Sequence, residues 1–220
     1  MPESKSSLIT LAHPRSSAAE AYRALRANLF LSTLDHPLHT VVVASAAPGE
    51  DKSVALANLA VVMAQGGQRV IVVDADLRHP ALHELFGVPN ERGLATLLDG
   101  QAAVTAPPLA TVADVENLQL LASGPLPLDP AAQLGSKRME EVIAALQKRA
   151  EVVLLDAPPV LVATDAVVLG TKADGVVLVV KAGHTRREHV EQAKEKLEKA
   201  HVRIVGVAPT HAPAGKSLGY

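Results

Sequence analysis

Short apolar runs alternate with longer segments of helical periodicity through most of the chain. The runs are rich in Val, Leu and Ile with little polar alternation, as in strands buried on both faces of a parallel sheet. They span residues 40–44, 69–74, 117–122, 151–156, 175–181 and 203–208. Between them the pattern predicts helices at 52–65, 80–86, 92–98, 136–149, 162–171 and 186–199. The order predicts an α/β fold, a doubly wound and mostly parallel sheet with its ligand chemistry at the carboxyl ends of the strands.

The first helix is predicted ahead of the sheet, over residues 17–33. Ser17 and Glu20 have the spacing of a capping box, and apolar positions follow at helical intervals. A second capping box is predicted at Thr185 and Glu188, at the start of the last helix.

Residues 1–16 are polar and contain Pro2 and Pro14, so we expect a flexible arm there. We expect one domain over residues 17–210 and a short tail over 211–220. The stretches 101–116 and 124–130 are predicted to be surface loops.

Composition excludes several classes of protein. The 220 residues are 48% hydrophobic and 20% charged. That balance rules out wholesale disorder. The net charge is −2 and only 2% of the residues are aromatic. Both values argue against a nucleic-acid partner.

Cysteine is absent from the chain. Its absence excludes disulfides and thiol catalysis and suits the cytoplasm. No apolar run approaches the roughly 20 residues of a membrane-spanning helix, and we expect no signal peptide.

A candidate phosphate-binding loop follows the first strand, at residues 45–53. Backbone N–H groups at a helix start bind phosphate, a lysine reaches the terminal phosphates, and a hydroxyl binds Mg²⁺. Lys52 and Ser53 stand at those last two positions. The strict motif fails at both glycines, which here are Ala46 and Asp51, so an ordinary Pro-Gly turn before a helix is the alternative.

Acidic residues follow two further strands. Asp74 and Asp76 end the second run, and their spacing points both side chains the same way, so that they can share a metal or a proton. Asp156 ends the fourth run, as a carboxylate directed at Mg²⁺ would. The alternative for Asp74 and Asp76 is a cap on the following helix.

Taken together, these motifs resemble the bacterial tyrosine kinases (BY-kinases) of capsule and exopolysaccharide export, which have a P-loop fold of the deviant Walker A type. The resemblance covers roughly residues 17–210 and is carried by Pro48-Gly-Glu-x-Lys-Ser53, Val73-Asp-Ala-Asp-Leu-Arg78 and Leu155-Asp-Ala-Pro-Pro159. It implies ATP or ADP and Mg²⁺ as cofactors and tyrosine phosphorylation as the activity.

The same resemblance implies a role for each matching residue. Lys52, Asp74 and Asp76 would be catalytic, with one aspartate acting as base. Ser53, Asp76 and Asp156 would bind the metal. The nucleotide would be held by Pro48, Gly49, Glu50, Asp51, Lys52, Ser53 and Arg78.

Glu20, Arg23 and Arg26 match the family's E-x-x-R-x-x-R oligomerisation motif, which implies a ring of identical subunits. Solvent-exposed helix charges are the alternative. The implied partner is the cytoplasmic tail of a membrane polysaccharide co-polymerase, which would recruit a cytoplasmic protein to the inner membrane. The Met1 start favours a membrane partner encoded as a separate protein. A partitioning-type ATPase is disfavoured because Ala47 stands where that branch has a signature lysine.

Asp51 is the main departure from the family, which has glycine there. A unit charge at ~4 Å and an effective dielectric of ~20 is worth about 4 kcal/mol, enough to weaken ATP binding about a thousandfold. The alternatives are that Asp51 pairs with Lys52, caps the helix, or turns outward and leaves ATP binding intact. The tail offers only Tyr220 as phosphoacceptor. These departures favour a pseudokinase with weakened ATP binding, with an active tyrosine autokinase as the alternative.

Overall fold

The computed structural model describes residues 8–31 and 36–212 of the chain. Seven strands form one sheet in the order β3-β4-β2-β5-β1-β6-β7. All neighbouring pairs are parallel except β3 with β4. The strands are β1 (Thr40–Ser45), β2 (Val70–Asp74), β3 (Ala110–Thr111), β4 (Leu118–Leu121), β5 (Val152–Asp156), β6 (Gly175–Lys181) and β7 (Ile204–Thr210). The predicted doubly wound, mostly parallel sheet is confirmed.

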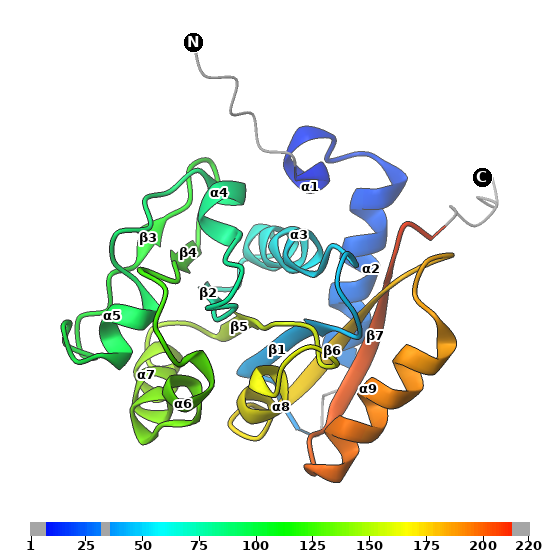
Figure 1. Ribbon diagram of the computed structural model, residues 1–220. Coiled ribbons are helices and arrows are strands. Elements are labelled where there is room, and N and C mark those ends of the chain that lie inside the picture. The colour runs from blue at the N-terminus through cyan, green and yellow to red at the C-terminus, as the bar shows by residue number, and fades with distance from the viewer. Residues whose placement is uncertain (1–7, 32–35, 213–220) are drawn as a thin grey trace.

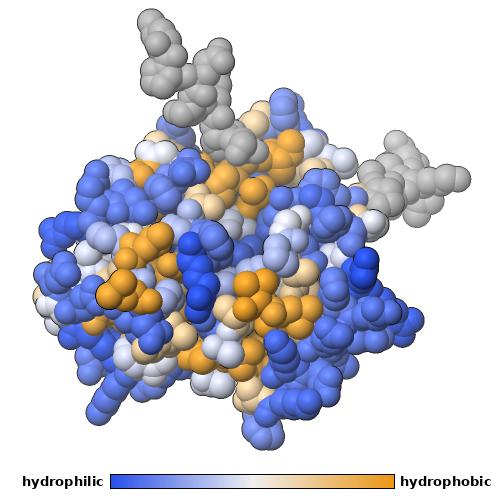
Figure 2. All heavy atoms as spheres, viewed as in Figure 1, coloured by the Kyte–Doolittle hydropathy of each residue, from blue (hydrophilic) through white to orange (hydrophobic). Residues whose placement is uncertain are grey.

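Nine helices are present in the described part of the chain, on both faces of the sheet. Figure 1 shows α1 to α4 on one face and α6 to α9 on the other. They are α1 (Ile9–Ala12), α2 (Ser17–Leu31), α3 (Lys52–Gln65), α4 (Leu82–Phe86), α5 (Leu94–Leu98), α6 (Pro130–Gly135), α7 (Lys137–Gln147), α8 (Asp165–Gly170) and α9 (Arg187–Lys199). Hydrophilic side chains cover much of the outer surface, with apolar patches between them (Figure 2).

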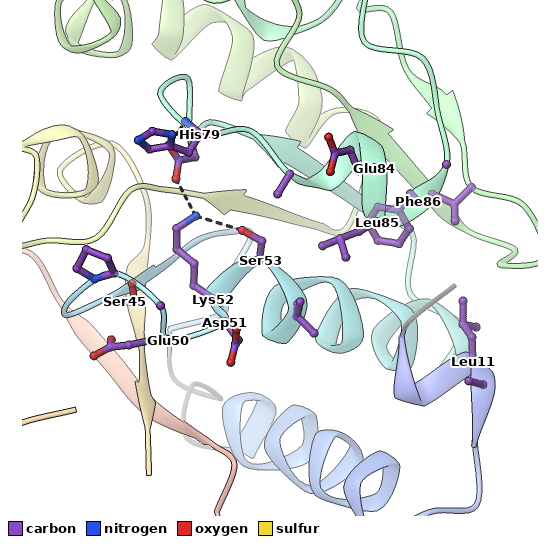
Figure 3. A pocket seen from close by; sticks show the side chains of 18 of the residues that line it. Leu11, Ser45, Glu50, Asp51, Lys52, Ser53, His79, Glu84, Leu85 and Phe86 are labelled. Atoms are coloured by element: carbon purple, nitrogen blue, oxygen red, sulfur yellow. Dashed lines mark hydrogen bonds and ion pairs between the residues drawn. The ribbon is translucent and has the colours of Figure 1, made fainter. Parts of the chain in front are cut away.

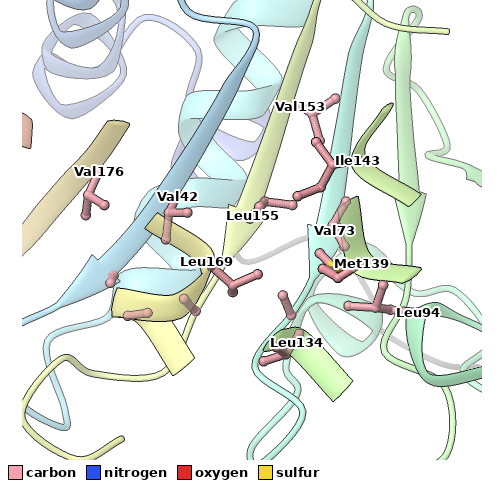
Figure 4. Close-up of a cluster of buried hydrophobic side chains, with 14 of the residues drawn as sticks. Val42, Val73, Leu94, Leu134, Met139, Ile143, Val153, Leu155, Leu169 and Val176 are labelled. Carbon is pink, nitrogen blue, oxygen red and sulfur yellow. The ribbon is translucent and has the colours of Figure 1, made fainter. Parts of the chain in front are cut away.

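The central strands are apolar on both sides because each face of the sheet has its own core. In β1, Val42 packs into the cluster beneath α5 to α9, while Val41 and Val43 pack against α3. The strands β2 and β5 alternate in the same way, and Figure 4 shows part of the first cluster. This double burial explains why the runs lack polar alternation.

The expected flexible arm is wrong for residues 8–16. Leu8 is fully buried, and α1 packs against α3. The backbone N–H and hydroxyl of Thr10 both donate to Asn58 Oδ1, at 3.0 and 2.8 Å. The domain therefore begins at least as early as residue 8, while residues 1–7 lie outside the described part.

Both predicted capping boxes are wrong. Helix α2 begins at Ser17, and the Oγ of the preceding Ser16 accepts the N–H of Ala19 at 3.2 Å. At α9 the N-cap is Arg186, and Thr185 forms its hydrogen bonds elsewhere. The first predicted loop also contains the short strand β3, and α6 begins at the last residue of the second. The helix predicted to reach residue 33 is described only as far as Leu31.

Candidate active site

The loop between β1 and α3 turns through two residues with positive φ. Gly49 has φ 79° and Asp51 has φ 58°. The left-handed region favours glycine, and aspartate is among the few other residues that tolerate it, at a cost of about 1–2 kcal/mol. Asp51 therefore keeps the backbone conformation expected of a glycine, and α3 starts directly after it at Lys52.

The amine of Lys52 lies at the centre of the predicted cluster. Its Nζ is 2.9 Å from Asp76 Oδ2 and 3.0 Å from Asp156 Oδ1, and it donates to Ser53 Oγ at 3.2 Å. The Ser53 hydroxyl donates in turn to Asp156 Oδ2 at 2.5 Å. Two strand ends and one helix start thus bring these four predicted residues together.

Burial and charge set the protonation of this cluster. Burial alone would lower the pKa of Lys52, but the carboxylates of Asp156 and Asp76 outweigh it and raise that pKa. Burial raises the pKa of Asp156 against the opposing effect of Lys52. Lys52 therefore stays charged and ready to neutralise an anion.

Asp74 and Asp76 have different surroundings despite their spacing. Asp74 is fully buried, and its Oδ2 accepts the N–H groups of Ala81 and Leu82 at 3.1 and 2.9 Å. Its Oδ1 has no hydrogen-bond partner among the described residues. Burial and the nearby Asp156 raise the pKa of Asp74 to about 7. The carboxylate of Asp74 thus holds the start of α4, as in the capping alternative, while Asp76 contacts Lys52.

The side chain of Arg78, expected to hold the nucleotide, is bound to another residue of the chain. Its Nε and Nη2 donate to the buried carboxylate of Asp165, at 2.9 and 3.1 Å. Asp165, at the start of α8, was not among the predicted residues. A guanidinium held by two hydrogen bonds is fixed in orientation, so Arg78 links the β2 loop to α8.

Glu50 turns its side chain into the protein rather than toward the cavity. Its Oε2 accepts the N–H groups of Ala46 and Ala47, at 2.9 and 3.2 Å. Its Oε1 accepts the hydroxyl of Thr185 at 2.6 Å. Glu50 thus stabilises the loop from within, and only its backbone remains for a nucleotide.

Asp51 takes the outward placement, the third of those left open by the sequence. Its side chain makes no capping hydrogen bond to α3, and its Oδ2 accepts Lys181 Nζ at 2.8 Å. His211 Nδ1 lies 3.6 Å from the same oxygen. Figure 3 shows the side chains of Asp51 and Lys52 leaving the loop in opposite directions. Burial and the charge of Asp51 raise the pKa of Tyr22 on α2.

A large open cavity lies over the loop. It has a volume of about 1530 Å³ and is lined by residues 48–54, Asp76 and His79 at one end. Leu11, Leu85 and Phe86 line the other end (Figure 3). Such a cavity leaves room for a nucleotide and for part of a second substrate beside it.

The predicted oligomerisation residues have partners within the chain. Arg23 pairs with Glu20 and donates to the carbonyl of Pro14 at 2.6 Å. Arg26 donates to the carbonyl of Val62 at 2.8 Å, near the end of α3. The phosphoacceptor candidate Tyr220 lies outside the described residues.

Sequence reasoning missed the residues that approach the loop from β6 and β7. Lys181 and Thr185 are about 130 residues away in sequence, and Thr210 is further still. The carboxyl ends of parallel strands meet at one edge, so the end of the predicted strand 175–181 offered a signal for Lys181. Thr185 offered none, since its spacing from Glu188 suggested a cap.

Within the described residues, no helix has the length and apolar character needed to cross a membrane. Residues 41–214 match the family described as the CobQ/CobB/MinD/ParA nucleotide binding domain. The chain is 38% identical over 199 residues to the tyrosine-protein kinase YwqD of Bacillus subtilis, covering 90% of this chain and 83% of that protein.

The chain is also similar to part of a longer tyrosine-protein kinase and to a solved structure. The chain is 30% identical to the tyrosine-protein kinase wzc of Salmonella typhimurium over 92% of its own length, but spans only 28% of that protein. The crystal structure of the chimerical protein CapA2B2 superposes with a TM-score of 0.89 at 33% identity, covering 94% of this chain and 91% of that one.

Proposed function

Because the chain belongs to the bacterial tyrosine-protein kinases, within the CobQ/CobB/MinD/ParA nucleotide-binding family, we propose that it binds Mg-ATP and phosphorylates tyrosine. The observation that carries this proposal is the opposite placement of two neighbours in the phosphate loop. Lys52 points into the acidic cluster with Asp76 and Asp156, while the Asp51 carboxylate lies outside that cluster and pairs with Lys181.

The residues present fit a magnesium ion bound together with a nucleotide. Ser53 Oγ and the carboxylates of Asp76 and Asp156 are oxygen donors, which Mg²⁺ prefers. The described residues contain no group of three or more acidic, His or Cys side chains that could hold a metal. Mg²⁺ in nucleotide sites usually takes its remaining ligands from phosphates and water. The ion would neutralise charge on the transferring phosphoryl group.

We propose the following roles for these residues in the reaction. Lys52 neutralises the terminal phosphates once its contacts with Asp76 and Asp156 are exchanged for phosphate oxygens. Asp76, which lines the cavity, accepts the proton of the tyrosine hydroxyl. The phenolic oxygen forms a bond to the γ-phosphorus as the bond to the β,γ-bridging oxygen breaks, and ADP leaves with that electron pair.

A pseudokinase that regulates polysaccharide polymerisation and export is the second candidate. It is favoured by the Asp51 charge itself and by the single tyrosine, Tyr220, in the tail. In both cases the proposed partner is the cytoplasmic tail of a membrane polysaccharide co-polymerase, which would bring the protein to the inner membrane. We propose that copies assemble through the α2 face carrying Glu20, Arg23 and Arg26.

Phosphotyrosine detection by mass spectrometry, after incubation of the purified chain with Mg-ATP, separates the two candidates. Phosphotyrosine in the unmodified chain and in Lys172→Met, but not in Lys52→Met, supports the kinase. Lys172 is a matched control because its amine also forms an ion pair, with Glu140. It lies just before the start of β6, whereas the site lies beyond the carboxyl ends of the strands. Absence of phosphotyrosine from all three chains, with and without the membrane partner's tail, would favour the pseudokinase.

A further inference from the structure

Lys181 and Asp51 form an ion pair beside the phosphate loop that no catalytic role explains. The pair joins the last residue of β6 to the residue immediately before α3, at 2.8 Å. Both side chains are partly exposed, at 27% and 38%. A surface pair of this kind contributes about 0–1 kcal/mol to folding, so stability alone gives little reason for its precise placement.

The β6–α9 connection is fixed against the loop by a chain of hydrogen bonds. The Thr185 hydroxyl accepts the backbone N–H of Lys181 at 2.7 Å and donates to Glu50 Oε1 at 2.6 Å. Glu50 is almost completely buried, and the hydroxyl of Thr210 donates to its carbonyl at 3.3 Å. These bonds bring the Lys181 backbone to a fixed position beside the loop, from which its amine reaches Asp51 Oδ2 and lies 3.4 Å from the Gly49 carbonyl.

The electrostatic consequence concerns the anion that the loop would bind. An unpaired carboxylate at Asp51 would repel phosphate by up to about 4 kcal/mol at ~4 Å and an effective dielectric of ~20. An ammonium 2.8 Å from that carboxylate nearly cancels its charge at longer range. The N–H groups of the loop and the Lys52 amine then face the phosphates without opposition from Asp51.

We propose that Lys181 is a positioning residue that permits nucleotide binding by neutralising Asp51 and holding its carboxylate outside the phosphate site. This inference rests on the proposed function. Asp51 and Lys181 act as a unit, in which the lysine affects nucleotide binding only while the aspartate is present. His211 is a second and more distant neighbour of the same carboxylate, at 3.6 Å.

A double-mutant cycle tests this dependence by calorimetric titration with Mg-ADP. Lys181→Met should lower the affinity at least tenfold in the natural sequence and less than twofold in the Asp51→Gly background. Lys181→Arg should stay within about threefold of the unmodified chain, because it keeps the charge. His211→Gln should cost less than Lys181→Met, and Lys172→Met should have no effect. Thermal unfolding of each variant, with Lys181→Gln as a second neutral substitution, separates weak binding from loss of the fold.

The outcomes distinguish this inference from the proposed function. An equal loss in both backgrounds would overturn the inference, because Lys181 would then act on the nucleotide directly. No loss in either background would overturn it as well. Binding by Asp51→Gly but not by the unmodified chain would overturn the neutralisation and favour the pseudokinase. Failure of every chain, Asp51→Gly included, to bind Mg-ADP would overturn the proposed function, and the inference with it.

Discussion

Asp51 and Lys52 are neighbours in the chain, yet their side chains enter opposite environments. The Lys52 amine lies in a buried cluster with Asp76 and Asp156, and its side chain is 11% exposed. The Asp51 carboxylate lies in the outer pair with Lys181, close to solvent. Buried charges interact strongly and are costly to leave unpaired, whereas exposed pairs are weak. The inner cluster thus dominates the energetics of the site, and the outer pair adjusts its net charge.

Removing the lysine of the inner cluster should have the largest effect. Lys52→Met leaves two acidic groups without their counter-charge, and breaking a buried pair costs about 3–5 kcal/mol. We expect loss of phosphotyrosine formation and a loss of about 3 kcal/mol in the free energy of unfolding at pH 7, measured by urea denaturation. Lys172→Met, which breaks a more exposed pair, should cost less than about 1 kcal/mol. Equal costs for the two variants would contradict the difference between the buried cluster and a more exposed ion pair.

The pH dependence of stability tests the burial of Asp74. Its folded-state pKa, about 7, lies above its usual value of 3.8. Between these values the folded state binds more protons than the unfolded state, so this group's stabilisation is lost as the pH rises through about 7. From pH 5 to pH 8 the unmodified chain should lose about 2 kcal/mol relative to Asp74→Asn.

Urea denaturation of both proteins at the two pH values measures this difference. Asparagine can still accept the N–H groups at the start of α4, so the fold should persist. Glu141→Gln, on the exposed side of α7, is the control and should follow the unmodified chain. Parallel pH profiles for the unmodified chain and Asp74→Asn would show that the Asp74 pKa is not raised.

Thr185 tests the connection between the two regions. Thr185→Val keeps the shape of the side chain but removes the hydroxyl that donates to the Glu50 carboxylate. A hydrogen bond to a charged group contributes about 1.5–3 kcal/mol, so we expect a loss of about 1.5 kcal/mol in urea denaturation. Nucleotide affinity should also fall, because Lys181 loses its fixed position. A stability loss without any change in affinity would confine Thr185 to a structural role.

The charges on α2 should have the smallest effect within one chain. Glu20 and Arg23 are substantially exposed and form an i,i+3 pair. Pairs with this spacing on a helix contribute about 0.2–0.5 kcal/mol. Arg23→Ala should change the free energy of unfolding by less than about 1 kcal/mol, but should lower the assembly state seen by light scattering. An unmodified chain that stays monomeric at high concentration, even with the membrane partner's tail, would refute assembly through α2.

The sequence was sufficient to predict the elements and site residues that depend on local sequence pattern. The parallel strands and longer helices follow from apolar periodicity, whereas β3 does not. Lys52, Ser53, Asp76 and Asp156 follow from loop and strand-end motifs. Contacts between distant segments could not be predicted in this way. The packing of α1 depends on the hydrogen bond between Thr10 and Asn58. The Thr185 hydroxyl does not cap α9 but donates to Glu50, which is 135 residues away in the sequence.

The placement of the Asp51 carboxylate also depends on a contact between distant segments, which local sequence does not predict. A negative charge in a phosphate loop is unfavourable when only the neighbouring sequence is considered, and weakened ATP binding stays a prediction on that ground. The direction of its carboxylate depends on Lys181, which the pairing of β1 with β6 brings beside the loop. The consequence of a substitution in such a loop therefore depends on the charges that the fold places beside it.

Titration of the unmodified chain with Mg-ADP is the most direct test of a nucleotide site that tolerates Asp51. A neutralised Asp51 predicts a dissociation constant in the micromolar range by calorimetry, and a loss of at least a hundredfold in Lys52→Met. A chain that gives no binding at millimolar Mg-ADP, while Asp51→Gly binds in the micromolar range, would contradict the account, because the Asp51 charge would then act on the phosphates despite Lys181.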